Sequence, residues 1–185
     1  MTTPANLTAL VGGRVIDPAN GFDGIADVVC GDGKVLAVGS GVAATYLDAD
    51  RIDCTNLIVT PGLIDLHVHV YPGLGNFCVT PDQAGVERGV PIVVDGGTSG
   101  TATMQLALDW LDAAQPKTKV LSFMDPCVLY LATHDFICHK LEIANDTRNL
   151  DLDAAADLLE LHADRIVGFK VRACHTGDPE VSPFL

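Results

Sequence analysis

The sequence predicts an α/β protein, in which a small β-rich segment precedes part of a (β/α)8 barrel. Three observations predict this fold class: short β-type runs before Pro61, alternating apolar runs and helical stretches after it, and the regular spacing of those apolar runs. Short apolar strands that alternate with helices are typical of parallel β/α units. A complete barrel needs ~250 residues, or about 30 per unit. The 185 residues are therefore expected to include about the first four units.

Residues 1–60 are expected to form the β-rich segment. Glycines punctuate it, and Gly31-Asp32-Gly33 is a hairpin signal between two β-type runs. The expected strands cover residues 7–16 (broken by Gly12-Gly13), 26–30 and 34–38, with one or two more between 51 and 60. The Thr60-Pro61-Gly62 punctuation places the boundary between two domains, 1–60 and 61–185.

Residues 61–185 are expected to form the first half of the barrel. Buried strands are predicted at residues 63–70, 89–95, 119–124 and 166–172, and helices at 101–115 and 152–165. Met104, Leu108 and Leu111 fall on one side of the first helix, and Pro116 ends it. Asp151 or Asp153 is suited to cap the second.

The amino-acid composition limits the kinds of binding partner that are expected. The chain has 11 Lys and Arg against 24 Asp and Glu, a formal net charge of −13, which argues against nucleic-acid or anionic-membrane binding and leaves a small-molecule substrate. No apolar run approaches the ~18 residues of a membrane span. The N-terminal residues do not resemble a signal peptide, and the six cysteines are scattered, so a cytoplasmic location with free thiols is expected.

The strongest chemical motif is the run Pro61-Gly-Leu-Ile-Asp-Leu-His-Val-His69. Because strand side chains alternate between faces, Asp65, His67 and His69 are expected to share the inward face. Two imidazoles at a strand end can both reach one metal ion, and neutral imidazole suits zinc. Asp65, one layer deeper, is expected to orient these ligands. The alternative is a pair of hydrogen-bonded core histidines.

A second motif is Gly168-Phe-Lys-Val-Arg172. The same alternation directs Lys170 and Arg172 inward, and a charged lysine is costly there, which favours the neutral amine. A neutral amine can add carbon dioxide to form a carbamate, which can bridge two metal ions. The alternative is a lysine paired with an internal carboxylate such as Asp65 or Asp95.

These motifs, with Gly12-Gly-Arg-Val-Ile-Asp17 and Asp95-Gly-Gly-Thr-Ser-Gly100, resemble the metal-dependent amidohydrolases, and most of all their amidohydrolase/deacetylase branch. Dihydroorotases belong to the same superfamily. The resemblance implies a centre of two divalent metal ions, of which zinc is expected. It implies that His67 and His69 hold the first ion and that carbamylated Lys170 bridges to the second. The remaining ligands and the aspartate base are expected beyond Leu185, so no catalytic base is assigned within these residues.

Three further residues are candidate substrate contacts. Arg172 can pair with a substrate carboxylate, His175 follows the last predicted strand, and Asp95 ends an earlier one. The loop from Asp95 to Gly100 can also be a tight strand-to-helix turn capped by Thr98 or Ser99, or an anion site.

The expected function is hydrolysis of an amide or ester bond in N-acyl amino acids or acylated hydroxy acids, by part of a longer enzyme. A dihydroorotase-like cyclic amidase is the second expectation. The third is an inactive chain that needs a partner, either a homo-oligomer or the missing C-terminal half of the barrel.

Overall fold

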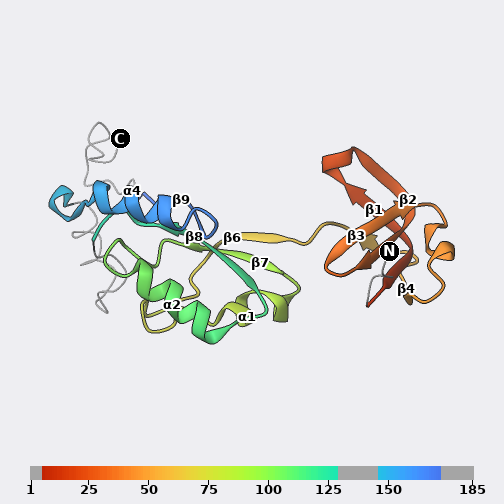
Figure 1. Cartoon of the computed structure of the whole chain (residues 1–185), viewed down its shortest axis with the longest axis horizontal. Helices are drawn as coiled ribbons and strands as arrows, with labels where there is room; N and C mark the ends of the chain where they lie inside the picture. Colours follow the sequence, from red (N-terminus) through yellow and green to blue (C-terminus); the bar gives the residue numbers. More distant parts are fainter. Residues whose placement is uncertain (1–5, 129–145, 172–185) are drawn as a thin grey trace. The chain divides into compact units, whose positions relative to one another are not determined.

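The computed structural model describes residues 6–128 and 146–171, and its chain divides into two compact units (Figure 1). The boundary falls between Pro61 and Gly62. The Pro-Gly dipeptide suits a boundary between units. Proline fixes its own φ angle, and glycine, which has no β-carbon, allows many backbone conformations.

The first unit contains a five-stranded sheet. Its strands are β1 (Thr8–Asp17), β2 (Phe22–Gly31), β3 (Lys34–Gly39), β4 (Asp50–Asp53) and β5 (Ile58–Val59), with short 3-10 helices η1 (Pro18–Asn20) and η2 (Val42–Thr45). The order is β3-β2-β1-β4, and β5 also pairs with β1. The β1–β2 and β2–β3 pairs are antiparallel, whereas β4 and β5 run parallel to β1.

The Asp-Gly hairpin expected between β2 and β3 is confirmed. Asp32 and Gly33 have φ angles of 50° and 72°, which is the left-handed pair that a two-residue type I′ turn requires.

The break expected at Gly12-Gly13 is a register shift inside one continuous strand. Gly12 has a φ of 72°, and its backbone N–H donates to Oδ1 of the buried Asp27 at 3.0 Å. Oδ2 of the same carboxylate accepts from the N–H of Ala43 at 3.2 Å. A buried carboxyl group therefore satisfies backbone donors that the bulge and η2 would otherwise leave unpaired.

The second unit contains four parallel strands in chain order, β6-β7-β8-β9. Its elements are β6 (Ile64–Val68), α1 (Pro81–Ala84), η3 (Val86–Arg88), β7 (Ile92–Gly96), α2 (Met104–Ala114), β8 (Lys119–Met124), η4 (Thr147–Asn149), α4 (Leu152–Leu161) and β9 (Ile166–Phe169). Sequential parallel strands with intervening helices confirm the α/β class.

The two longer helices pack on one apolar cluster. α2 buries Met104, Leu108 and Leu111 against Met124 and Ile166 of the sheet, which confirms the predicted face of this helix. The cluster also contains Ala155 of α4, together with Tyr71 and Ala107.

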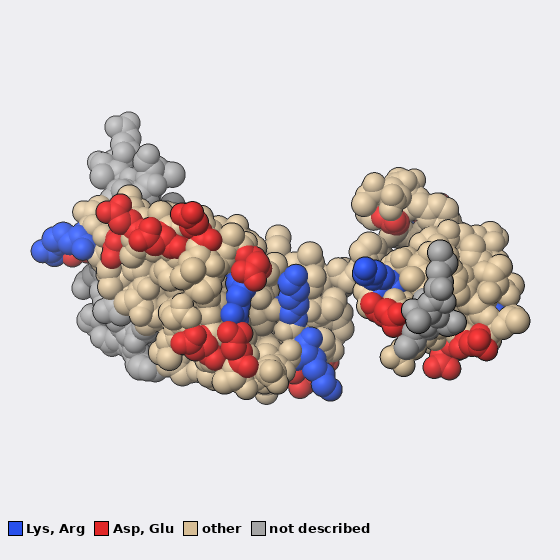
Figure 2. All heavy atoms as spheres, viewed as in Figure 1, with Lys and Arg blue, Asp and Glu red and all other residues tan. Residues whose placement is uncertain are grey.

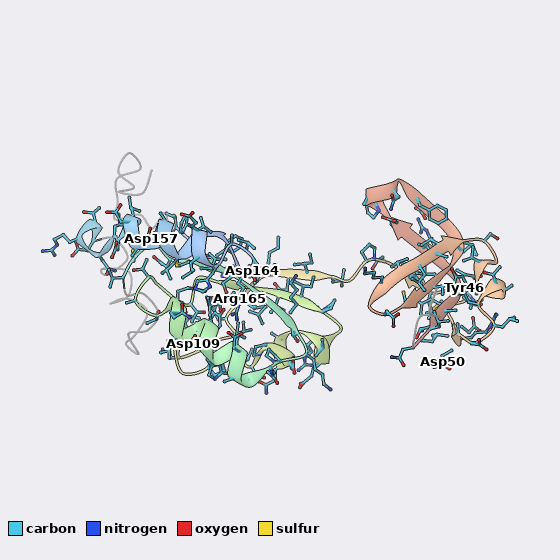
Figure 3. All side chains as sticks on the ribbon, in the orientation of Figure 1. Tyr46, Asp50, Asp109, Asp157, Asp164 and Arg165 are labelled. Atoms are coloured by element: carbon cyan, nitrogen blue, oxygen red, sulfur yellow. The ribbon has the colours of Figure 1, made fainter. Side chains whose placement is uncertain are left out.

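Polar contacts fix the start of α4 and the segment between α4 and β9. The side chain of Asp151 accepts from the N–H of Ala154 at 3.0 Å, so Asp151 is the cap of this helix. Arg165, labelled in Figure 3, precedes β9 and donates to Asp112 of α2 at 3.0 Å and to the Leu108 carbonyl at 3.3 Å.

Some expected boundaries and burial patterns are wrong. The run at 63–70 was predicted to be a buried strand, but Ile64 is 53% and Leu66 is 63% exposed, because β6 lies at the end of the described sheet and pairs with β7 alone. Burial begins only at Val70, which is fully buried. α2 starts three residues later than expected, at Met104, and β9 ends at Phe169.

Figure 2 shows acidic side chains gathered over α4. Exposed acidic side chains of this segment are Asp153, Asp157, Glu160 and Asp164. Within residues 6–128 and 146–171, no helix has the length and apolar character needed to cross a bilayer. The four cysteines in these ranges, Cys30, Cys54, Cys78 and Cys127, are free thiols.

Candidate metal centre

The predicted ligands lie where strands of the second unit end. His67 is the second-to-last residue of β6, His69 directly follows that strand, and Lys170 directly follows β9. Parallel strands end at the same edge of their sheet, and in open α/β sheets this carboxyl edge is where ligands bind. The candidate ligands therefore lie at the edge of the sheet where a binding site is expected.

The pairing of β6 with β7 has a bulge that includes His67. Asp65 pairs with Val93, but Val68 pairs with Asp95, so two residues of β6 oppose one of β7. The strict alternation assumed from the sequence is interrupted at this point, since a bulge bends its strand and re-aims side chains. Oδ1 of Asp65 accepts from the backbone N–H of His67 at 3.0 Å, so Asp65 contacts the main chain of this candidate ligand. Its role in orienting the metal ligands remains a prediction.

Two glycines at the end of β7 make room for the candidate ligands. A Cβ atom at Gly96 would overlap the imidazole of His67, at 2.6 Å from Nε2. A Cβ atom at Gly97 would lie 2.5 Å from Cβ and 2.6 Å from Cγ of Lys170. Consecutive Cα atoms are only about 3.8 Å apart. The His67 ring and the Lys170 stem, which are 103 positions apart in the sequence (170 − 67), therefore lie against neighbouring residues.

The two imidazoles lie close together. Their ring centroids are 5.5 Å apart at an interplanar angle of 72°. The ring of Phe77 contacts His69 edge to face, with centroids 5.0 Å apart. This packing restricts the orientation of His69.

His69 is also held by a chain of hydrogen bonds. Its Nδ1 lies 2.7 Å from Oγ1 of Thr98, and that hydroxyl donates to Oδ2 of Asp95 at 2.8 Å. Asp95 is fully buried and accepts from the backbone N–H groups of Val70 at 2.9 Å and Thr98 at 2.7 Å. Burial raises the pKa of Asp95 above its usual range, and the hydrogen bonds from these backbone groups oppose the increase.

This arrangement gives Thr98 a role that the sequence reasoning missed. The sequence predicted a tight strand-to-helix turn capped by Thr98 or Ser99. Thr103 occupies the N-cap position of α2, without a capping hydrogen bond from its side chain. The available signal was the three-residue spacing of Asp95 and Thr98 in a loop after a strand, where a carboxylate commonly accepts hydrogen bonds from a nearby residue. Asp95 was predicted to contact substrate, and that contact remains a prediction.

The other candidates are placed as follows. Lys170 is half-buried, and its backbone N–H donates to the Met124 carbonyl at 2.9 Å. In residues 6–128 and 146–171, Lys170 forms no ion pair with Asp65 or Asp95. Arg172 and His175 lie outside the described residues.

The donors that are present suit a metal ion. Imidazole nitrogens are good zinc ligands, and the glycine pair leaves the rings and the lysine stem unobstructed by side chains from β7. No group of three or more His, Cys, Asp or Glu within the described ranges is arranged to hold a metal. The candidate centre therefore consists of two imidazoles and needs a ligand of another kind, for which Lys170 is positioned.

An apolar groove of about 820 Å³ lies elsewhere in this unit. It is lined by residues of α4 and by Phe169 and Val171, and none of the candidate ligands lines it. Phe169 and Val171 line this groove, whereas Lys170 between them does not. We therefore locate the candidate chemistry at the histidines and not in this groove.

Parallel β/α units with paired histidines at a strand end are consistent with a protein of the amidohydrolase type. No family model matches the chain. A deacetylase from Agrobacterium fabrum is 32% identical over 158 residues, which is 84% of this chain and 37% of that protein. A dihydroorotase from Citrifermentans bemidjiense is 56% identical over 64 residues, or 34% of this chain and 15% of that protein.

Solved structures agree with these relatives. The crystal structure of a dihydroorotase matches 92% of this chain and 43% of that chain, with a TM-score of 0.75 and 26% identity. The chain thus spans about two fifths of the length of the deacetylase and of this solved dihydroorotase. It is part of an amidohydrolase-type protein, as the resemblance in its motifs predicted.

Proposed function

We propose that this chain is part of a metal-dependent hydrolase that cleaves amide or ester bonds, with N-acyl amino acids or acylated hydroxy acids as substrates. The observation that carries the proposal is the convergence of His67 and Lys170 on the Gly96-Gly97 pair, with His69 beside His67. The deacetylase relative supports the substrate class, because its similarity extends over most of the chain.

In this proposal His67 and His69 hold one divalent metal ion, for which zinc is the expected element. Lys170, carbamylated by carbon dioxide, supplies an anionic ligand that reaches a second ion. When bound, such ions lower the pKa of water and polarise a carbonyl group. The aspartate base and the other ligands are proposed to lie on later strands of a (β/α)8 barrel, of which this unit is the first half. The β-rich residues 1–60 are proposed to be part of a composite β-sandwich domain.

Hydrolysis of a cyclic amide is the second candidate. The dihydroorotase relative favours it because the identity reaches 56%, although only over 64 residues. The third candidate is an inactive chain or half barrel that needs a partner. The cytoplasmic location expected from the sequence stays part of the proposal.

Zinc binding tests the proposed centre. The purified chain is titrated with zinc in bicarbonate buffer against a chromophoric chelator, beside His67→Ala, His69→Ala and Lys170→Ala. Lys119→Ala, at the opposite end of β8 from the site, is the matched control. We expect each site variant to bind zinc more weakly than the control. Equal zinc affinity in all five proteins would refute the proposed centre.

Substrate class is tested separately, with N-acetyl amino acids and dihydroorotate as the two arms. Because hydrolysis needs a positioned base that is proposed to lie beyond Leu185, we expect turnover only when the missing part is supplied. Turnover by the 185 residues alone near the ~10 per second of a typical enzyme, lost in His67→Ala, would show that these residues already contain the base.

A further inference from the structure

We propose that Thr98 and Asp95 act as positioning residues that fix the tautomer of His69, so that its Nε2 carries the lone pair. The inference rests on the proposed metal centre for its consequence, but the hydrogen-bond relay itself is a property of this chain. Neither residue needs to touch a metal or a substrate for the relay to act.

The direction of the relay follows from counting hydrogens. A threonine hydroxyl has one hydrogen to donate. Thr98 donates it to Oδ2 of Asp95 at 2.8 Å, so only its oxygen lone pairs remain for Nδ1 of His69 at 2.7 Å. That contact is a hydrogen bond only when Nδ1 carries the hydrogen. In a neutral imidazole the lone pair is then on Nε2.

The carboxyl end of the relay is locked in place. Oδ1 of Asp95 accepts from the Thr98 N–H, and Oδ2 accepts from the Val70 N–H as well as the Thr98 hydroxyl. Asp95 and Thr98 are both fully buried. With both carboxylate oxygens accepting from the backbone, the group cannot rotate without breaking hydrogen bonds that water does not replace.

The consequence is specific to metal binding. A histidine ligates through an unprotonated nitrogen, and the hydrogen bond made by the other nitrogen decides which one this is. Without the relay, His69 divides between two tautomers, and the one with a hydrogen on Nε2 does not offer that nitrogen to a metal. Val70, whose N–H is bound by Asp95, also directly follows His69, so the relay restrains both the ring and the adjoining backbone.

The first test needs no metal. Nitrogen-15 spectra of the imidazoles, recorded on the metal-free chain at about pH 8.5, above the ~6.5 at which histidines usually titrate, distinguish protonated from unprotonated ring nitrogens. We expect His69 to carry its hydrogen on Nδ1 and to become a mixture of tautomers in Thr98→Val. A hydrogen on Nε2 in the unsubstituted chain would overturn the relay.

The second test measures zinc affinity by chelator competition. Thr98→Val keeps the shape of the side chain but removes the hydroxyl, and we expect a loss of about 10–100-fold. Thr98→Ser restores the hydroxyl and is expected to return most of the affinity. Thr101→Val, the same change in the same loop, is the matched control. A Thr98→Val chain that binds zinc as tightly as this control would overturn the positioning role.

The two tests separate the relay from the proposed function. If the unsubstituted chain binds no zinc but shows the Nδ1-protonated tautomer, the proposed metal centre is wrong and the relay stands. If zinc binds and the tautomer is the other one, the centre stands and the relay is wrong. Circular dichroism of each variant verifies that a lost affinity does not come from unfolding.

Discussion

The imidazole of His67 lies in the space that a β-carbon at position 96 would occupy, with Nε2 only 2.6 Å from where that atom would be. Real Cβ atoms essentially never approach a neighbour below 3.0 Å, so any residue other than glycine at this position displaces the ring. The site thus depends on the absence of a side chain on β7 as much as on the histidine itself.

We expect Gly96→Ala to lower zinc affinity by at least ~10-fold, because it shifts a proposed ligand without removing it. Chelator competition measures the change. Gly24→Ala in the first unit is the control, since a β-carbon there meets only the ring of Phe22 at an ordinary 3.5 Å. Unchanged zinc affinity in Gly96→Ala would mean either that His67 is not a ligand or that the backbone of β7 shifts to accommodate the new methyl group.

Gly97 and Gly73 have similar left-handed backbone angles but different surroundings, so alanine substitutions at the two positions can be compared. Gly97 and Gly73 have φ angles of 86° and 90°, where a β-carbon costs roughly 1–2 kcal/mol. A β-carbon at Gly97 overlaps the stem of Lys170, whereas one at Gly73 meets nothing within 4 Å. We expect Gly97→Ala to reduce the free energy of unfolding by about 1–3 kcal/mol more than Gly73→Ala does.

Urea denaturation followed by tryptophan fluorescence measures this difference. Trp110 is the chain's one tryptophan, and it packs against the apolar cluster of the second unit, so its emission reports on that unit. Equal losses in the two variants would show that the Lys170 stem moves aside at little cost.

The contrast between these glycines and the histidines shows which features the sequence could predict. The histidine pair, the Asp-Gly hairpin and the apolar face of α2 were predictable because each depends on residues a few positions apart. The bulge of β6 and the bond from His69 to Thr98 were not, because both are set by how β6 and β7 pair across 29 positions. From the sequence, Gly96 and Gly97 could be recognised only as loop residues, because their contacts with His67 and Lys170 also depend on strand pairing.

Tyr71 makes the stability of the second unit sensitive to alkaline pH. It is 1% exposed, and its hydroxyl lies 2.6 Å from Oγ of Ser122. Burial raises the pKa of Tyr71 well above the ordinary 10.0. The folded state keeps this proton above pH 10, while the unfolded chain releases it. The stabilisation is therefore complete below about pH 10 and is lost as the pH rises further, by up to ~1.4 kcal/mol per pH unit.

We expect Tyr71→Phe to remove this part of the pH dependence between about pH 10 and pH 12. At neutral pH it should cost about 0.5–1.5 kcal/mol, since the hydrogen bond to Ser122 is lost. Urea midpoints from Trp110 fluorescence at each pH give both values. The control is Tyr46→Phe. Tyr46, labelled in Figure 3, lies in the first unit, so this change should leave the pH dependence of the second unit's stability as it is. Parallel profiles for Tyr71→Phe and the unsubstituted chain would contradict the assignment.

The apolar cluster between α2 and the sheet is expected to stabilise the second unit. Leu108 of α2 is 1% exposed and belongs to the cluster that includes Met124 of β8 and Ile166 of β9. Lys170 directly follows β9. Leu108→Ala removes buried methyl groups and leaves a cavity, so we expect it to cost about 2–5 kcal/mol. Leu106→Ala, two positions away on the same helix and 58% exposed, is the matched control and should cost far less.

Both variants are measured by urea denaturation with Trp110 fluorescence, and zinc affinity is recorded for each under conditions where the unit is folded. Because Leu108 belongs to an apolar cluster whose buried members include none of the candidate ligands, Leu108→Ala should lower the unfolding free energy while the folded chain still binds zinc. A zinc affinity that falls in step with stability would mean that the positions of His67 and Lys170 depend on how tightly α2 packs. A cost equal to that of Leu106→Ala would mean that the cluster closes around the missing side chain.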